Sequence, residues 1–151
     1  MSDDDLRELY QDIILDHSKH PRNFGKLDGA NREARGYNPL CGDRVTLALK
    51  VDGERIADAR FEAKGCAISV ASASMMTELV RGKTVAEARA LFERFHGLVT
   101  GKPVEADGEA MERLAALSGV RDFPSRIKCA TLPWHALTAA LDGGATEVKT
   151  E

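Results

Sequence analysis

The chain has few cysteines, and those it has are scattered. Cys41, Cys66 and Cys129 are the only three among 151 residues, and no two of them form a Cys-x-x-Cys pair. An odd number of widely spaced cysteines argues against the disulfide frameworks of small secreted domains. The missing Cys-x-x-Cys pair argues against zinc fingers and zinc ribbons. We therefore expect thiols that are kept reduced for metal or sulfur chemistry.

Long apolar runs and a strong excess of one charge are also missing. No apolar stretch approaches the roughly 18 residues that cross a bilayer. The net charge of −3 favours neither a nucleic-acid partner nor a membrane surface. The first residues, Met1 to Asp5, are acidic where a secretory or transit peptide would be basic, so we expect a cytoplasmic protein. The length suits a single domain spanning 1–151 with a core of its own.

Hydrophobic spacing predicts a helix followed by a hairpin. The helix starts near Asp3, ends before Pro21, and carries apolar residues at helical spacing: Leu6, Leu9, Tyr10, Ile13 and Ile14. His17 and His20 fall at its end, where a charged imidazolium would suit the helix dipole. Residues 23–38 are expected to be part strand and part loop. One strand of the hairpin alternates through Val45, Leu47, Leu49 and Val51, and Asp52-Gly53 is the predicted turn. The return strand, 54–63, is predicted to place Ala57, Ala59, Phe61 and Ala63 on one face.

The second half of the chain is predicted to be helical. One helix covers 67–80, and Thr84 with Glu87 forms a capping box for the next. A segment at about 101–120 carries Met111, Leu114 and Leu117 at a spacing of three. The last helix is predicted to begin near Cys129, with Pro133 in its first turn and Gly143-Gly144 at its end, before a frayed tail at 145–151. Strands followed by helices predict an α+β fold with a small antiparallel three-stranded sheet packed against helices.

Four residues are candidate metal ligands. Cys41 and Asp43 lie two apart at the start of a strand, Cys66 follows Gly65 between a strand and a helix, and Cys129 is expected at or just before a helix start. Helix N-termini lower the pKa of nearby thiols. Three thiolates and one carboxylate suit Zn²⁺ or an iron–sulfur cluster. From these residues alone the metal stays open, and so does a role for each cysteine as a small buried apolar residue.

Two longer motifs resemble a known family. Gly36-Tyr37-Asn38-Pro39-Leu40-Cys41-Gly42-Asp43 and the stretch from Ala59 to Ser69 around Gly65-Cys66 are similar to the iron–sulfur assembly family that includes IscU, the NifU N-terminal domain and SufU. The similarity extends through 71–78, Gly82-Lys83-Thr84 and the early stretch from Asp16 to Asn23. It implies the α+β fold predicted above.

Departures from IscU indicate the SufU branch. The third cysteine follows Lys128, where IscU has a histidine, and the Leu-Pro-Pro-Val-Lys chaperone motif of IscU is broken in Asp122-Phe123-Pro124-Ser125-Arg126-Ile127-Lys128. The segment at about 101–120 also resembles an insertion found in SufU. A lysine ammonium cannot ligate iron, which argues against a [2Fe–2S] scaffold.

The resemblance implies a zinc-dependent sulfurtransferase that works with a SufS-type cysteine desulfurase. Zinc would be held by Cys41, Asp43, Cys66 and Cys129, with positive charge nearby from Lys64, Arg126 and Lys128. Cys41 is the predicted sulfur acceptor and Cys129 its rival; Arg126 is predicted to steer the persulfide or contact the desulfurase. Sulfur would pass on to downstream cluster assembly proteins. Two alternatives stay open: a scaffold that assembles a transient [2Fe–2S] cluster on the same residues, and a zinc protein whose metal only stabilises the fold.

Overall fold

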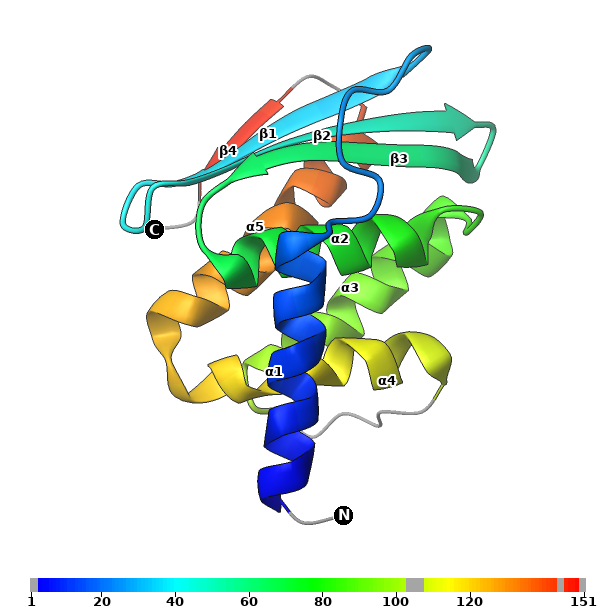
Figure 1. The fold of residues 1–151 in the computed structure, drawn as a ribbon. Coiled ribbons are helices and arrows are strands. Elements are labelled where there is room, and N and C mark those ends of the chain that lie inside the picture. Colours follow the sequence, from blue (N-terminus) through cyan, green and yellow to red (C-terminus); the bar gives the residue numbers. More distant parts are fainter. Residues whose placement is uncertain (1–2, 103–107, 144–145, 150–151) are drawn as a thin grey trace.

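A four-stranded sheet forms one side of the molecule, and the helices cover a single face of it (Figure 1). The computed structural model describes residues 3–102, 108–143 and 146–149. The strands are β1 (Arg32–Asn38), β2 (Asp43–Asp52), β3 (Arg55–Lys64) and β4 (Thr146–Lys149). The helices are α1 (Asp3–Lys19), α2 (Ala67–Val80), α3 (Val85–Val99), α4 (Glu109–Leu114), the 3₁₀ helix η1 (Ala115–Asp122) and α5 (Pro124–Leu141). None of the described helices is long and apolar enough to span a bilayer. The predicted α+β class is confirmed.

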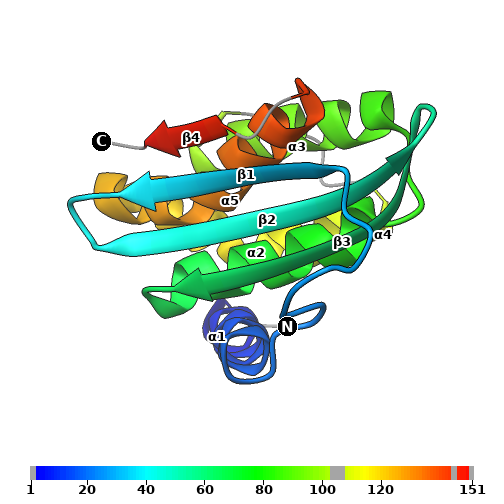
Figure 2. The same cartoon turned by 90° about the horizontal axis from the view of Figure 1, so that it is seen from above.

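The sheet has the order β3-β2-β1-β4 (Figure 2). The predicted antiparallel three-stranded part is confirmed, because β1 pairs with β2 and β2 with β3 in antiparallel register. β4 adds a parallel edge strand beside β1. Residues 146–149, expected to be frayed, thus form a paired strand, while 145, 150 and 151 lie outside the described residues. Gly143, with φ of 104°, lets the chain turn back after α5 towards the open edge of β1.

The β2–β3 hairpin differs from its prediction by one residue. Asp52 pairs with Arg55, so the two-residue turn is Gly53-Glu54, with Gly53 in the left-handed region at φ of 63°. The register then shifts between Lys50 and Val51. This bulge changes which side chains of β3 face the helices: Ile56 is buried and Ala57 is exposed. The prediction for Ala57 was wrong because a strict period of two ignores the bulge.

The helices before α5 begin and end close to where the spacing predicts. α1 ends at Lys19, α2 spans 67–80, and Thr84 and Glu87 form the predicted capping box at α3. The apolar residues of α4 and η1 that were predicted from their spacing are all buried: Met111, Leu114 and Leu117. That this segment is an insertion stays a prediction, and residues 103–107 of it lie outside the described residues.

The start of α5 was predicted wrongly. α5 begins at Pro124, so Cys129 is its sixth residue and Pro133 lies in the helix interior. Proline is favoured at the first position of a helix, and Pro124 occupies this position in α5. Pro133 has no N–H to offer the carbonyl of Cys129. Beside this break the Ser72 hydroxyl donates to the Ala130 carbonyl at 2.5 Å, so α2 and α5 are joined next to Cys129.

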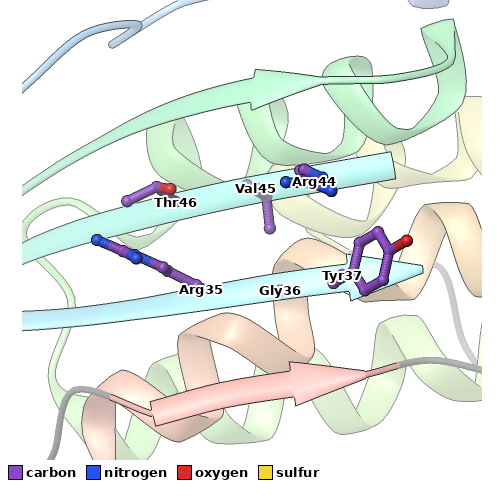
Figure 3. Close-up of a pocket in the computed structure, with 6 residues that line it drawn as sticks. All are labelled: Arg35, Gly36, Tyr37, Arg44, Val45 and Thr46. Atoms are coloured by element: carbon purple, nitrogen blue, oxygen red, sulfur yellow. The ribbon is translucent and has the colours of Figure 1, made fainter. Parts of the chain in front are cut away.

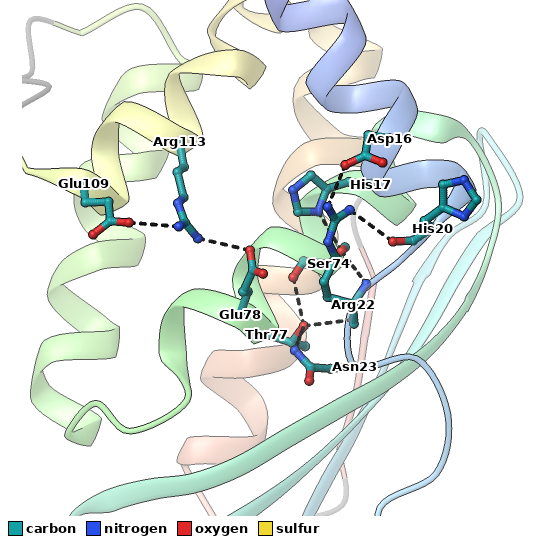
Figure 4. Close-up of polar contacts among 10 residues, drawn as sticks. All are labelled: Asp16, His17, His20, Arg22, Asn23, Ser74, Thr77, Glu78, Glu109 and Arg113. Atoms are coloured by element: carbon teal, nitrogen blue, oxygen red, sulfur yellow. Dashed lines mark hydrogen bonds and ion pairs between the residues drawn. The ribbon is translucent and has the colours of Figure 1, made fainter.

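A polar cluster fixes the C-terminal end of α1 against α2 (Figure 4). His17 Nδ1 lies 2.8 Å from Ser74 Oγ, which also accepts the backbone N–H of Arg22 at 2.9 Å. Arg22 makes an ion pair with Asp16 at 2.6 Å. His17 is buried, and burial, assisted by the Arg22 guanidinium, lowers the pKa of its imidazole. The sequence favoured a charged His17; the structure favours a neutral one, because packing against α2 removes it from water.

The lowered pKa of His17 predicts a pH-dependent stability. The unfolded chain takes up a proton near pH 6.5, whereas the folded imidazole does so only at lower pH. Stability contributed by neutral His17 is therefore present above pH 6.5 and is lost as the pH falls below that value. Thermal unfolding of the chelator-treated protein at pH 7 and pH 5 should show a smaller drop in Tm for His17→Gln than for the wild type. His20→Gln, at an exposed position, should behave as the wild type; equal drops for His17→Gln and the wild type would contradict this prediction.

Candidate metal centre

The loop between β1 and β2 presents Cys41 to solvent. β1 ends at Asn38, which pairs with Asp43 at the start of β2, leaving the four residues 39–42 as the loop. Gly42 has φ of 72° and its N–H bonds to the Asn38 carbonyl at 2.8 Å, which closes the turn. Cys41 is exposed and Asp43 is fully buried. Two ligand candidates two residues apart therefore have very different access to water.

The Asp43 carboxylate is fixed by the start of α2. The backbone N–H of Cys66 donates to Asp43 Oδ1 at 2.9 Å, and Cys66 Sγ lies 3.7 Å from Asp43 Oδ2. Gly65 leaves the space that this contact needs, because a Cβ at position 65 would lie 2.9 Å from Asp43 Cγ. The sequence marks Gly65 as permissive, but only the folded structure identifies what a side chain there would displace.

Cys129 approaches the same point from α5. It is 1% exposed, and its Sγ lies 3.6 Å from Cys41 Sγ across 88 residues of sequence. Ligand atoms of Cys41, Asp43 and Cys129 all lie within 4.8 Å of one another. Cys66 stands outside this group of three and joins it through its contacts with Asp43, so the four residues that the sequence suggested lie in one region of the structure.

Two of the spacings between candidate ligand atoms match those of a tetrahedral metal site. With Zn–S near 2.3 Å and Zn–O near 2.1 Å, tetrahedral geometry separates neighbouring ligand atoms by roughly 3.5–3.8 Å. The sulfur–sulfur distance between Cys41 and Cys129, 3.6 Å, and the sulfur–oxygen distance between Cys66 and Asp43, 3.7 Å, both match. A disulfide needs about 2.05 Å, and all three cysteines are free. The donor set of three sulfurs and one carboxylate oxygen thus fits zinc.

The protonation of Cys129 differs from the prediction. Burial, together with the neighbouring Asp43 carboxylate and the other two cysteines, raises the pKa of the Cys129 thiol far above its usual range. The predicted lowering by a helix N-terminus does not apply, because Cys129 lies in the second turn of α5 rather than at its start. The protein alone therefore holds Cys129 as a neutral thiol, and a bound cation would favour its thiolate.

The predicted basic residues each lie within three positions of a candidate ligand in the sequence. Arg126 is exposed on α5 one turn before Cys129, and within the described parts of the chain no ion pair or side-chain hydrogen bond joins it to another residue. Lys64 is exposed beside Gly65, and Lys128 is half-buried next to Cys129. These positions leave the guanidinium and ammonium groups available to an incoming molecule.

A shallow hollow of about 340 Å³ lies on the outer face of the sheet (Figure 3). Arg35, Tyr37, Arg44 and Thr46 line it, and the Arg44 guanidinium lies 5.0 Å from the centre of the Tyr37 ring. Arg44 is exposed while its neighbour Asp43 is buried, because successive residues of a strand face opposite ways. The hollow contains no thiol, imidazole or carboxylate and is therefore separate from the cysteine site.

Two buried polar side chains near the cysteines were missed from the sequence. Asn38 and Ser69 are almost completely buried, and Asn38 Nδ2 and Ser69 Oγ lack hydrogen-bond partners within the described residues. Asn38 stands in the motif around Cys41 and Ser69 in the motif around Cys66, but neither residue type by itself signals a role. Only burial and the missing partners single them out.

Comparison with known proteins identifies the family. Residues 9–141 match the NifU-like N terminal domain. The chain belongs to this family. The resemblance to SufU, IscU and NifU is thereby confirmed, and the chain is a member of the SufU and IscU group of iron–sulfur cluster assembly proteins.

Similar proteins have two different names. The zinc-dependent sulfurtransferase SufU of Bacillus subtilis (strain 168) is 46% identical over 132 residues, which cover 87% of this chain and 88% of that protein. The iron–sulfur cluster assembly scaffold protein IscU of Streptococcus pyogenes serotype M1 is 45% identical over 136 residues, covering 90% and 84%. The crystal structure of a candidate cluster assembly scaffold protein for the SUF system, from Fervidobacterium islandicum AW-1, has a TM-score of 0.82 and 36% identity, covering 89% of this chain and 98% of that one. These names include a sulfurtransferase and scaffold proteins, so the residues of the site have to distinguish between the two functions.

Proposed function

We propose that this protein is a zinc-dependent sulfur acceptor that takes persulfide sulfur from a SufS-type cysteine desulfurase for iron–sulfur cluster assembly. Cys41 is the acceptor, and Asp43, Cys66 and Cys129 retain the metal. The observation that carries the proposal is the contrast in exposure within one site: Cys41 is exposed, whereas Asp43 and Cys129 are buried. An incoming persulfide can reach Cys41 on its loop but not Cys129 inside the helical layer.

The transfer is a substitution at sulfur. The Cys41 thiolate attacks the outer sulfur of the desulfurase cysteine persulfide, a new sulfur–sulfur bond forms on Cys41, and the desulfurase cysteine leaves as a thiolate. The step involves no net oxidation or reduction. Bound zinc supplies the positive charge that keeps the cysteines deprotonated. Cys41 would attack as a free thiolate, while Asp43, Cys66 and Cys129 would hold the zinc. Gly42 beside it has φ of 72°, and a Cβ there would meet nothing within 4 Å, so this part of the loop is not held by packing.

The basic residues around the site suit an anionic donor. Arg126 is placed at the exposed start of α5, where its guanidinium can steer the persulfide or contact the desulfurase. Lys64 and Lys128 offset the local charge near −2 that three thiolates and one carboxylate leave around a divalent metal. The free thiols suit the reducing cytoplasm, and downstream cluster assembly proteins would receive the sulfur.

A cluster scaffold is the second candidate function, favoured by the likeness to proteins named IscU. The same four residues would then hold a transient [2Fe–2S] cluster. Lys128, next to Cys129, argues against it, since an ammonium group offers no lone pair to iron. In a third interpretation zinc only stabilises the fold, and the exposure of Cys41 then has no role in function.

Alanine production by the partner cysteine desulfurase tests the proposal. The zinc-loaded protein should strongly stimulate alanine release from cysteine, because it clears the persulfide from the desulfurase. A sample stripped of metal by a chelator should stimulate much less, since no cation then keeps the cysteines deprotonated and the site is no longer held together. No stimulation by the zinc-loaded protein would contradict sulfur acceptance and favour the scaffold or the structural zinc protein.

A further inference from the structure

Two buried polar atoms without partners lie beside the proposed metal ligands. Within the described residues, the buried side-chain nitrogen and oxygen atoms that make no hydrogen bond are Asn38 Nδ2 and Ser69 Oγ. The residues are 0% and 1% exposed. Leaving a buried donor unpaired costs free energy, so each such atom needs an explanation. Their position in the two cysteine motifs offers one.

Ser69 lies in the first turn of α2, close to Cys66 along the chain. It is the third residue of α2, whose N-cap is Cys66, and the side chain at this helix position lies on the same side as the N-cap residue. One turn further along the same face, Ser72 reaches the Ala130 carbonyl on α5. The α2 face near Ser69 is thus the one that packs against α5 at Ala130, the residue after Cys129, and Cys66 stands at the start of this helix.

Asn38 borders the site from the sheet. It is paired across the strands with Asp43, and both are buried on the face that packs against the helices. Its Oδ1 accepts the N–H of Leu40 at 3.2 Å, which fixes the amide so that Nδ2 is the end left over. Two residues earlier, Gly36 packs against Leu132, because a Cβ there would lie 2.9 Å from Leu132 Cδ1. α5 runs opposite to β1 (Figure 2), so Cys129, one turn before Leu132, lies towards the Asn38 end of β1.

We infer that Asn38 Nδ2 and Ser69 Oγ donate hydrogen bonds to the cysteine sulfurs once these are metal-bound thiolates. The inference rests on the zinc site of the proposed function. A thiolate sulfur keeps lone pairs that the metal does not use, and N–H and O–H groups beside it stabilise its negative charge. Asn38 and Ser69 are thus positioning residues that set how firmly the thiolates hold the metal. They pair in the loaded protein and stay unpaired without metal.

Ser69→Ala gives the sharpest test, because two readouts should move in opposite directions. Without metal the variant should melt at a higher temperature than the wild type, since it loses a buried hydroxyl that has no partner. With zinc it should bind the metal about 10-fold more weakly in a chelator competition, as losses of outer-shell partners do. With Co²⁺ as the probe, the sulfur-to-cobalt charge-transfer band should move to longer wavelength, because the thiolate loses a donor.

Ser72→Ala is the matched control on the same helix. Its hydroxyl donates to the Ala130 carbonyl and accepts from Trp134 Nε1 at 3.1 Å. The change should therefore lower the melting temperature with and without metal and leave the cobalt band in place. A structural role for Ser69 would give this same pattern.

Asn38→Ala tests the second donor, with Asn31→Ala as its control. Asn31 uses both ends of its amide on Val51, at the opposite end of the same strand pair. Both variants should lose stability, but only Asn38→Ala should move the cobalt band to longer wavelength and weaken zinc binding about 10-fold.

The outcomes distinguish a failure of the metal site from a failure of the proposed hydrogen bonds. A wild type that shows no sulfur-to-cobalt band would overturn the metal site and, with it, this inference. A wild type with that band, and Ser69→Ala and Asn38→Ala variants with unchanged bands and zinc affinity, would overturn only the inference. A shifted band in both variants and an unchanged one in both controls would support it.

Discussion

Replacing Cys41 by alanine is expected to abolish the stimulation of the cysteine desulfurase, so that alanine release falls to the rate of the desulfurase alone. Cys41 is the exposed thiol of the site, and the remaining cysteines are half-buried and buried. Asp43, Cys66 and Cys129 would still hold zinc, with water in the fourth position, as in sites with three protein ligands. The loss should therefore appear in a protein that is folded and loaded with metal.

Zinc content and thermal unfolding of the Cys41→Ala variant are the necessary controls. The structural zinc reading expects a drop in stability with no specific loss of sulfur transfer. Mass spectrometry of the wild type after incubation with desulfurase and cysteine should place the extra sulfur on Cys41. A zinc-loaded Cys41→Ala variant that still stimulates, with the extra sulfur on Cys129, would assign the acceptor role to Cys129 instead.

Gly65→Ala is expected to weaken zinc binding by about 100-fold or more, beyond the usual loss from an outer-shell change. The new Cβ would lie 2.9 Å from Asp43 Cγ and 3.0 Å from Asp43 Cα, so both the carboxylate and the backbone behind it have to move. The bond from the Cys66 N–H to Asp43 Oδ1 is then lost, and the fourth ligand leaves its place. Competition for zinc against a chromophoric chelator measures the effect.

Gly82→Ala separates this clash from the cost of an alanine at a positive φ, since Gly65 has φ of 155°. Gly82 follows the other end of α2 with φ of 83°, and a Cβ there meets nothing within 4 Å. The variant should lose about 1–2 kcal/mol of stability, the cost of an alanine in that conformation, and bind zinc as the wild type does. Equal zinc affinities for the Gly65→Ala and Gly82→Ala variants would show that Asp43 does not depend on the space at position 65.

Local sequence patterns predicted most of the elements because they act over a few residues. The alternation through Val45, Leu47 and Leu49 defines a strand with one buried face, and Thr84 with Glu87 marks a helix start through two mutual hydrogen bonds. The prediction errors occur where one local pattern is compatible with two different structures. Pro124 starts α5, yet the prediction placed Pro133 in the first turn of a helix starting near Cys129, and a strict alternation in β3 missed the bulge beside Ala57.

The sequence by itself determined the α+β class, the family and the four candidate ligands, because these depend on residue types and short spacings. The tertiary structure decided how the four candidate ligands differ in burial and in position. Packing of α5 against α2 and the sheet buries Cys129, leaves Cys41 exposed and brings their sulfurs to 3.6 Å across 88 residues. It also decided that Gly65 makes room for Asp43 and that Asn38 and Ser69 are each buried with an unpaired polar atom. Exposure and distance between remote residues come from the packing of whole elements, which no local pattern encodes.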